Sequence, residues 1–472
     1  MTSIRHSILK GTLFTGLSKY ISLGVNLIVT AILARILPPE DFGIIALTTV
    51  FTSFFDILAT AGMVPAIIQN NQIIEDEYSD LFSFSMLMAF VVCVIYIVLI
   101  VPVSNFFAED RLRLLLLFLS VQLFFNTLNV VPQALILKDK NFRLLAIISS
   151  LGAIFWGIIS IILAFTGIGI YALIITPIGL SCSNFFLNYF LCGKMLKIRL
   201  KYSKASVRKI MSFSLYQLSF NFVNFFSRNL DKLLLGKFLG MSSLGYYEKS
   251  YKLMTLPIST LTNVLTPTVQ PVLANYQNEQ KTLHRVYLNF SDTLMLLGFV
   301  VAPFLFFASR ECILLVFGPQ WENAISVFKV LSISVPFQLV DSISGSIFQS
   351  TNKVKYLFKS GFICAIVNIL FLIVGLATGQ LMIVAIFVTI SLFLNFLISA
   401  YYINKLVFNS SIIEYLRFSC NHLPVALAIS IILFFEDKIN YPIILTFTIK
   451  AITCVIVFYL YCKIRKVRIL NI

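Results

Sequence analysis

Stretches of about twenty apolar residues recur along the chain, and this recurrence limits the possible fold more than any other feature. A helix needs roughly 20 mainly apolar residues to cross the hydrocarbon core of a bilayer, which is about 30 Å thick. The rule predicts an all-α, polytopic membrane protein with about fourteen transmembrane helices joined by short loops. The predicted spans are residues 12–34, 42–64, 81–103, 112–136, 144–166, 168–192, 210–234, 245–270, 286–308, 324–349, 356–377, 381–403, 415–435 and 441–462.

The composition excludes the other common classes of protein. Only 12% of the residues are charged, whereas soluble domains carry about 25%. The apolar and aromatic share of 59% also excludes a disordered chain, because disordered chains are poor in such residues. The eight cysteines stand singly in apolar stretches, so neither a disulfide framework nor a metal site is predicted. No nucleotide-binding loop occurs, and no cofactor is expected.

The distribution of Lys and Arg predicts the orientation of the spans. These residues are enriched in the cytoplasmic loops of membrane proteins, so their excess here is a signal of topology and no nucleic-acid partner is expected. With fourteen spans, 23 of them fall on the side of the N-terminus and 6 on the other side. Both termini are therefore predicted to be cytoplasmic. The loop from Glu75 to Asp80 is acidic and departs from this pattern, but acidic residues weigh little in the rule.

The most basic loop lies between the sixth and seventh predicted spans. The segment from Lys194 to Lys209 contains seven Lys and Arg residues. Cations next to a membrane attract anionic lipid headgroups, by about 1 kcal/mol per residue. They also act as a simple topology anchor, and this second interpretation is the favoured one. Membrane lipids are expected partners in either case.

The second half of the chain repeats features of the first half. At an offset of 202 residues, Arg35 aligns with Lys237, and later loops align at larger offsets. A repeat of six spans keeps both copies in the same orientation, which predicts two six-helix lobes related by a pseudo-twofold axis along the membrane normal. The predicted organisation is an N-lobe in residues 1–200, a C-lobe in residues 201–410 and two further helices in residues 411–472.

Polar side chains recur at steps of three or four residues in six predicted spans, which places them on one face of each helix. Examples are Thr52, Asn126 and Asn129. Polar groups in hydrocarbon are costly, so such a stripe either bonds to a neighbouring helix or faces water. Because the six stripes match across the repeat and most include charges, the favoured interpretation is one hydrated cavity between the two lobes.

Eight of these polar residues are candidate ligands for a substrate. Lys19 is the single charged residue in the predicted span 12–34, and an ionisable residue within a membrane is a functional hypothesis by default. Arg228, Asp231 and Lys232 share one helix face, where they form either a structural ion pair or a cationic site for an anion such as phosphate. The full set is Lys19, Asn26, Asp56, Arg228, Asp231, Lys232, Lys252 and Asp341.

Two other membrane lysines receive little weight as site residues. Lys329 and Lys450 are expected to extend their charged ends toward a membrane interface or to lie near one. No long loop carries a cluster of acidic residues, which a membrane glycosyltransferase or polymerase would be expected to show. No enzymatic activity is therefore predicted.

Three segments carry a recognisable pattern: Ala34 to Gly43 at the end of the first predicted span, Gly236 to Tyr247 in the repeat, and Leu315 to Lys329. The chain resembles the polysaccharide-transporter branch of the multidrug, oligosaccharidyl-lipid and polysaccharide exporter superfamily. The resemblance implies a flippase of the cytoplasmic (inner) membrane that moves undecaprenyl-diphosphate-linked oligosaccharides outward for O-antigen, capsule or exopolysaccharide synthesis. It also implies a polysaccharide polymerase and glycosyltransferases as partners, and a monomeric transporter.

A polar cavity suits such a function. Each hydroxyl group without a partner costs about 4 to 8 kcal/mol in an alkane-like medium, so a glycan needs a polar path while the polyprenyl tail stays in lipid. Rocking of two parallel lobes would give alternating access. Two alternatives stay open: a multidrug or small-cation exporter of the same superfamily, and an integral-membrane enzyme that acts on a polyprenyl-linked glycan.

Overall fold

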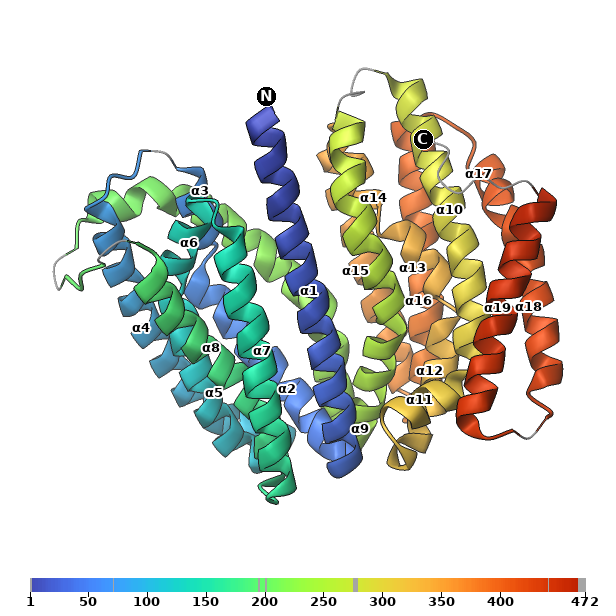
Figure 1. The fold of residues 1–472 in the computed structure, drawn as a ribbon, viewed down its shortest axis with the longest axis horizontal. Helices are drawn as coiled ribbons and strands as arrows, with labels where there is room; N and C mark the ends of the chain where they lie inside the picture. The colour runs from blue at the N-terminus through green and yellow to red at the C-terminus, as the bar shows by residue number, and fades with distance from the viewer. Residues whose placement is uncertain are drawn as a thin grey trace. The chain divides into compact units, whose positions relative to one another are not determined.

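The computed structural model describes residues 2–70, 72–193, 196–199, 202–274, 279–439 and 441–465. Throughout these residues the regular structure is helical, as Figure 1 shows, and they contain no strand. The predicted all-α class is therefore confirmed.

The chain forms two compact units, Met1–Leu244 and Gly245–Ile472, which we call unit 1 and unit 2. Unit 1 contains α1 (Thr2–Ile36), α2 (Pro39–Thr60), α3 (Met63–Gln69), α4 (Glu77–Phe107), α5 (Arg111–Leu128), α6 (Val130–Lys138), α7 (Phe142–Phe165), η1 (Gly169–Tyr171), α8 (Ala172–Leu191) and the first part of α9 (Lys204–Ala274).

Unit 2 contains the rest of α9 and the C-terminal helices (Figure 1). These helices are α10 (Gln280–Phe307), α11 (Ser309–Val316), η2 (Pro319–Trp321), α12 (Glu322–Ser332), α13 (Val335–Asp341), α14 (Ser344–Ser350), α15 (Val354–Leu376), α16 (Leu381–Tyr401), the π-helix η3 (Tyr402–Val407), α17 (Ile412–Ser419), η4 (Cys420–His422), α18 (Leu423–Glu436) and α19 (Ile443–Arg465).

Most of the predicted spans correspond to helices that could cross a membrane. In the described part of the chain, 11 helices are long and apolar enough, or up to 12 if the bent pair Pro319–Ser332 and Val335–Ser350 is one span. The two other predicted spans, 210–234 and 245–270, lie in α9, which is helical over both ranges. Charged residues occur within the apolar sequence of each. The multi-pass membrane fold is confirmed, while the count of fourteen stays a prediction.

The helix α9 carries the chain from unit 1 into unit 2. Gly240 interrupts it with φ 83° and ψ 172°, a combination that is essentially restricted to glycine. Before this break α9 lies against α2: a Cβ atom on Gly236 would be 3.0 Å from Leu47 Cδ2, and the rings of Phe54 and Phe222 are 5.8 Å apart. The packing of this part of α9 on α2 explains why unit 1 extends to Leu244, beyond the predicted boundary after residue 200. The three predicted domains stay a prediction.

The helix α1 packs along α7 within unit 1 (Figure 1). The Ser18 hydroxyl lies 2.8 Å from that of Ser150 and 3.1 Å from that of Ser149. A Cβ atom on Gly157 would be 2.8 Å from Val29 Cγ2. Small residues at this contact allow the two backbones to approach closely, as is common between membrane helices.

The C-terminal helices α18 and α19 lie side by side in unit 2 (Figure 1), and a buried lysine joins α19 to α11. Lys450 on α19 has 0% exposure, and its Nζ lies 2.8 Å from both Glu311 Oε1 and Asp437 Oδ1. It also donates to the Phe307 carbonyl oxygen at 2.7 Å. Whether Lys450 also lies near a membrane interface stays a prediction. Its charge is satisfied inside the protein, because two carboxylates from other segments converge on it.

Candidate functional site

Asp56 and Asn126 bring together the polar stripes of two predicted spans. Asp56 lies on α2 and Asn126 on α5, and the Asn126 amide donates to the two carboxylate oxygens at 3.2 and 3.4 Å. Both side chains are half-buried in unit 1. A carboxylate with one amide partner keeps further acceptor positions, so Asp56 is able to bind a hydroxyl or ammonium group of a ligand.

Other stripe residues contact neighbouring helices. Thr52 is buried, and its hydroxyl lies 2.9 Å from the Tyr96 hydroxyl of α4. Asn129 is buried and accepts a hydrogen bond from the Asn188 amide of α8 at 2.8 Å. Such bonds contribute about 0.6 kcal/mol each on average. At these two positions the structure supports interhelical bonding, the alternative that the stripes had left open.

The candidate residues of α1 and α9 have different exposures. Lys19 and Asn26 are exposed on α1, and the Asn26 amide oxygen accepts a hydrogen bond from the Thr30 hydroxyl at 3.4 Å. On α9, Arg228 is exposed, whereas Asp231 and Lys232 are half-buried. The Asp231 carboxylate accepts a hydrogen bond from the backbone N–H of residue 232 at 2.8 Å.

The remaining two candidates belong to unit 2. Lys252 is exposed on α9, and Asp341 is half-buried at the end of α13. The Ser344 hydroxyl donates to Asp341 Oδ1 at 3.3 Å. Since the eight candidate residues are divided between the two units, their assembly into one site stays a prediction.

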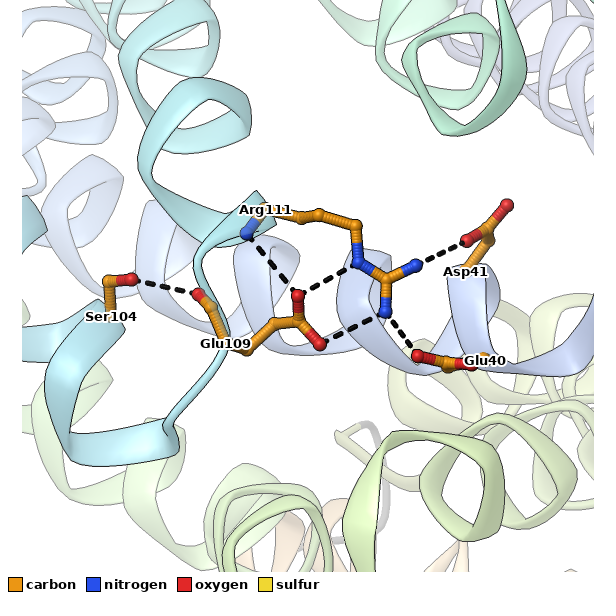
Figure 2. Close-up of polar contacts among 5 residues, drawn as sticks. All are labelled: Glu40, Asp41, Ser104, Glu109 and Arg111. Atoms are coloured by element: carbon orange, nitrogen blue, oxygen red, sulfur yellow. Dashed lines mark hydrogen bonds and ion pairs between the residues drawn. The ribbon is translucent and has the colours of Figure 1, made fainter.

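An ion-pair network around Arg111 was missed by the sequence analysis. Its guanidinium group contacts Glu40, Asp41 Oδ1 at 3.3 Å and Glu109 Oε1 at 2.8 Å, as Figure 2 shows. Glu40 and Asp41 lie in the first turn of α2, directly after Pro39, where the helix dipole favours negative charge. Carboxylates that follow a proline at a predicted helix start were a signal that could have identified this network.

The Arg111 network also joins two turns of unit 1. Glu109 precedes α5, and Asp41 begins α2, so the turn between α1 and α2 lies next to the turn between α4 and α5 (Figure 2). Hydrogen bonds from Arg111 lower the pKa of Glu109 below its ordinary value. The carboxylate form of Glu109 is therefore stabilised by the fold.

The acidic loop that departed from the charge pattern pairs with the basic segment. Arg199 contacts Asp80 and Asp76, each at 3.3 Å, and Lys209 Nζ lies 2.7 Å from Glu77 Oε1. These pairs place residues 76–80 at the same end of unit 1 as Arg199 and Lys209, as the predicted topology requires. The basic segment therefore has a structural role at Arg199 and Lys209.

In unit 2, His422 connects three helical elements. Its Nε2 lies 2.8 Å from Asp292 Oδ1 on α10, and its Nδ1 lies 2.9 Å from the Tyr461 hydroxyl on α19. The imidazole is buried. The sequence gives no sign of this cluster, because its members are far apart in the chain and share no motif.

The sequence of the whole chain is similar to those of known bacterial proteins. The profile of a family described as "Polysaccharide biosynthesis protein" matches residues 32–326. An "uncharacterized membrane protein in cps region" of Klebsiella pneumoniae is 25% identical over 462 residues, which cover 95% of this chain and 93% of that protein. The teichuronic acid biosynthesis protein TuaB of Bacillus subtilis is 24% identical, with 84% of this chain and 82% of TuaB covered.

A solved structure has the same fold. The lipid II flippase MurJ, in an inward closed conformation, matches with a TM-score of 0.71 and 15% identity over 96% of this chain and 98% of MurJ. At this identity the likeness concerns the fold alone. The family profile, in contrast, covers more than half of the sequence, and the chain therefore belongs to the polysaccharide biosynthesis protein family.

Proposed function

We propose that this protein is a flippase that moves an undecaprenyl-diphosphate-linked oligosaccharide from the inner to the outer leaflet of the cytoplasmic membrane. The observation that carries the proposal is the match of a multi-pass membrane chain to the polysaccharide biosynthesis protein family over residues 32–326. A glycan on a lipid carrier cannot cross hydrocarbon unaided, because its hydroxyl groups lose their water partners. The fold shared with a lipid II flippase supports this reading.

In this mechanism the sugars and the diphosphate follow a polar path between two lobes, while the polyprenyl chain stays in lipid. The half-buried pair of Asp56 and Asn126 supports the presence of polar groups within the helices of such a path. Lys19 and Arg228 are exposed and would contact the anionic diphosphate. An inside-negative potential favours outward movement by about 2.3 kcal/mol per negative charge per 100 mV.

The proposal places both termini in the cytoplasm. Contacts within unit 1 support the order of its loops: Arg199 with Asp80 joins two loops of the predicted inner side, and Arg111 with Asp41 joins two loops of the predicted outer side. The Lys237 ammonium donates to the Phe106 carbonyl at this second end. In each of these pairs, an even number of predicted spans lies between the two loops. Loops on the same side of the membrane meet this condition.

The proposed protein acts without a cofactor and without catalysis. It would work as a monomer beside a polysaccharide polymerase and glycosyltransferases that make and extend the glycan. Exposed Lys197, Lys204 and Arg208 of the basic segment would contact anionic lipid headgroups. The glycan would serve the synthesis of O-antigen, capsule or exopolysaccharide.

Deletion of the gene tests the proposal. Undecaprenyl-linked repeat units should accumulate on the inner leaflet, and the full chain supplied from a plasmid should restore the surface glycan. A deletion strain with a normal surface glycan and no such accumulation would refute the proposal. Drug sensitivity as the sole phenotype would favour the multidrug exporter. Purified protein that cleaves or extends a polyprenyl-linked glycan in vitro would favour the enzyme.

A further inference from the structure

An apolar groove of about 500 Å³ lies in unit 1 between α2, α4, α5 and α9. Leu47 and Leu116 form part of its buried wall, with 2% and 0% exposure. Phe106 and Phe238 also line it but are 58% and 65% exposed. The groove therefore combines a buried interior with an open aromatic rim.

The chemistry of the walls selects the kind of molecule that fills the groove. Its volume lies within the range of small-molecule sites, about 300 to 1,000 Å³. Apolar walls offer water few hydrogen-bond partners, and such cavities stay dry. An empty groove would deprive every wall of van der Waals contacts on one side. A hydrocarbon chain satisfies both conditions.

The surface of α4 that leads to the rim of the groove is exposed and apolar. Val98 and Val101 on this helix are 66% and 52% exposed, and Phe106 on the rim follows them one to two turns further along. On the opposite wall, the lining residues of α9 extend from Leu230 to Phe238, a rise of about 12 Å at 1.5 Å per residue. A single extended chain from the bilayer can therefore lie along the groove.

A lysine lies on the rim of the groove. Lys237 is exposed, its ammonium group donates to the Phe106 carbonyl oxygen, and its Nζ lies 4.6 Å from the centroid of the Phe106 ring. Both of these partners are uncharged, and Lys237 forms no ion pair with the residues that the structure describes. Glu109, three residues after Phe106, is paired with Arg111. Charge complementarity at the rim therefore favours an anionic headgroup.

We propose that the groove binds the polyprenyl chain of the transported lipid next to its phosphate, and that Lys237 contacts this phosphate. This inference rests on the proposed function and adds a binding site for the carrier lipid within unit 1. Its members are the apolar walls of α2, α4, α5 and α9 and the single ammonium group on the rim. The glycan is not part of this site, so the carrier lipid alone should bind.

Binding of undecaprenyl phosphate to the purified full-length protein tests the site, for example by native mass spectrometry. Val103→Trp places a large ring in the groove, and Val101→Trp on the exposed side of α4 is the matched control. We expect Val103→Trp to weaken binding at least about tenfold and Val101→Trp to leave it unchanged. Unchanged binding by a folded Val103→Trp variant overturns the proposal.

The lysine is tested separately. Lys237→Gln should weaken binding of undecaprenyl phosphate about tenfold, since a charge-assisted contact contributes about 1.5 to 3 kcal/mol and 1.4 kcal/mol corresponds to a factor of ten. Binding of the uncharged alcohol undecaprenol should not change. Arg113→Gln, at the same end of unit 1, is the control. An equal loss for the phosphate and the alcohol would overturn the role of Lys237.

Two further readouts keep the proposal open to refutation if Val103→Trp does not fold. A photoreactive undecaprenyl phosphate should crosslink to residues 103–116 and 230–238 of the unaltered protein, and crosslinks confined to other segments would overturn the groove. Phosphatidylglycerol should bind more weakly than undecaprenyl phosphate, and equal binding would assign the groove to bulk lipid.

The gene deletion tests the flippase function itself. Failure of the groove proposal can therefore be distinguished from failure of the proposed function.

Discussion

Lys450 Nζ lies 2.8 Å from Glu311 Oε1, and the lysine side chain is fully buried. The contact attaches α19 to the beginning of α11. Removal of one partner of a buried ion pair leaves an uncompensated charge, which costs about 3 to 5 kcal/mol. The pair therefore adds to the packing that holds α19 against α11 within unit 2.

We predict that Lys450→Met lowers the stability of the protein by about 3 kcal/mol or more, because Glu311 and Asp437 would lose their shared cation. The melting temperature of the purified protein in detergent measures the effect. Lys463→Met, at an exposed position of the same helix, should have little effect. Equal melting temperatures for the two variants would contradict the role of Lys450.

Arg199 pairs with one buried and one exposed carboxylate, so the contributions of the two pairs to stability can be compared. It contacts Asp80 and Asp76 at the same distance, 3.3 Å, but the Asp80 side chain is 8% exposed and the Asp76 side chain is 86% exposed. Asp80→Asn should destabilise unit 1 by about 1 to 3 kcal/mol, as for a buried charged hydrogen-bond partner. Asp76→Asn should cost less than about 1 kcal/mol, as for a surface pair. Denaturation of both purified variants checks this order, and the reverse order would refute it.

The Arg111 network predicts a dependence of stability on pH. Because Arg111 lowers the pKa of Glu109 from its ordinary value of 4.5, the pair contributes stability above pH 4.5. That contribution is lost as the pH falls through the lower pKa of the folded protein. Thermal unfolding of the protein and of Arg111→Gln should differ most at neutral pH and converge in acid.

Arg113→Gln is the control for this pH profile. Arg113 pairs with Asp110, whose side chain is 88% exposed, and a surface pair of this kind contributes little. The stability of the Arg113→Gln variant should equal that of the unaltered protein at every pH. A constant difference between Arg111→Gln and the unaltered protein, from neutral to acid pH, would exclude Glu109 as the titrating partner.

Close contact between α10 and α13 depends on Gly298. A Cβ atom on this residue would lie 2.4 Å from Pro336 Cα, so Gly298→Ala should force the helices apart at a cost of about 1 to 3 kcal/mol. Gly345→Ala on α14 is the matched control, because no atom lies within 4 Å of its added Cβ. The two melting temperatures test this prediction, and a Gly298→Ala variant as stable as Gly345→Ala would contradict it.

Transport itself is tested at the candidate ligands. Lys19→Ala and Asp231→Ala should each reduce glycan export at least about tenfold, since a charged contact to the substrate contributes about 1.5 to 3 kcal/mol. Protein abundance should be retained. Thr49→Ala is the control, because this exposed hydroxyl bonds to the backbone of its own helix. Export at the normal level by both charge variants would remove these residues from the site.

The sequence by itself determined the class of the protein and most of its membrane helices. Length and apolarity are properties of a continuous segment, and the bilayer thickness sets the length that is needed. The predicted spans 81–103 and 381–403, for example, correspond to helices Glu77–Phe107 and Leu381–Val407. The segment Ala34 to Gly43 also resembled the family that the profile match later confirmed.

Only the tertiary structure decided which partner each polar side chain meets. The helical period predicts that Thr52 and Asp56 share a face, yet Thr52 bonds to Tyr96 of α4 and Asp56 to Asn126 of α5. Likewise, the pattern within α19 did not show that Glu311 lies beside Lys450. Such contacts depend on the rotation and packing of helices that are far apart in the chain, and the pattern within one helix does not contain this information.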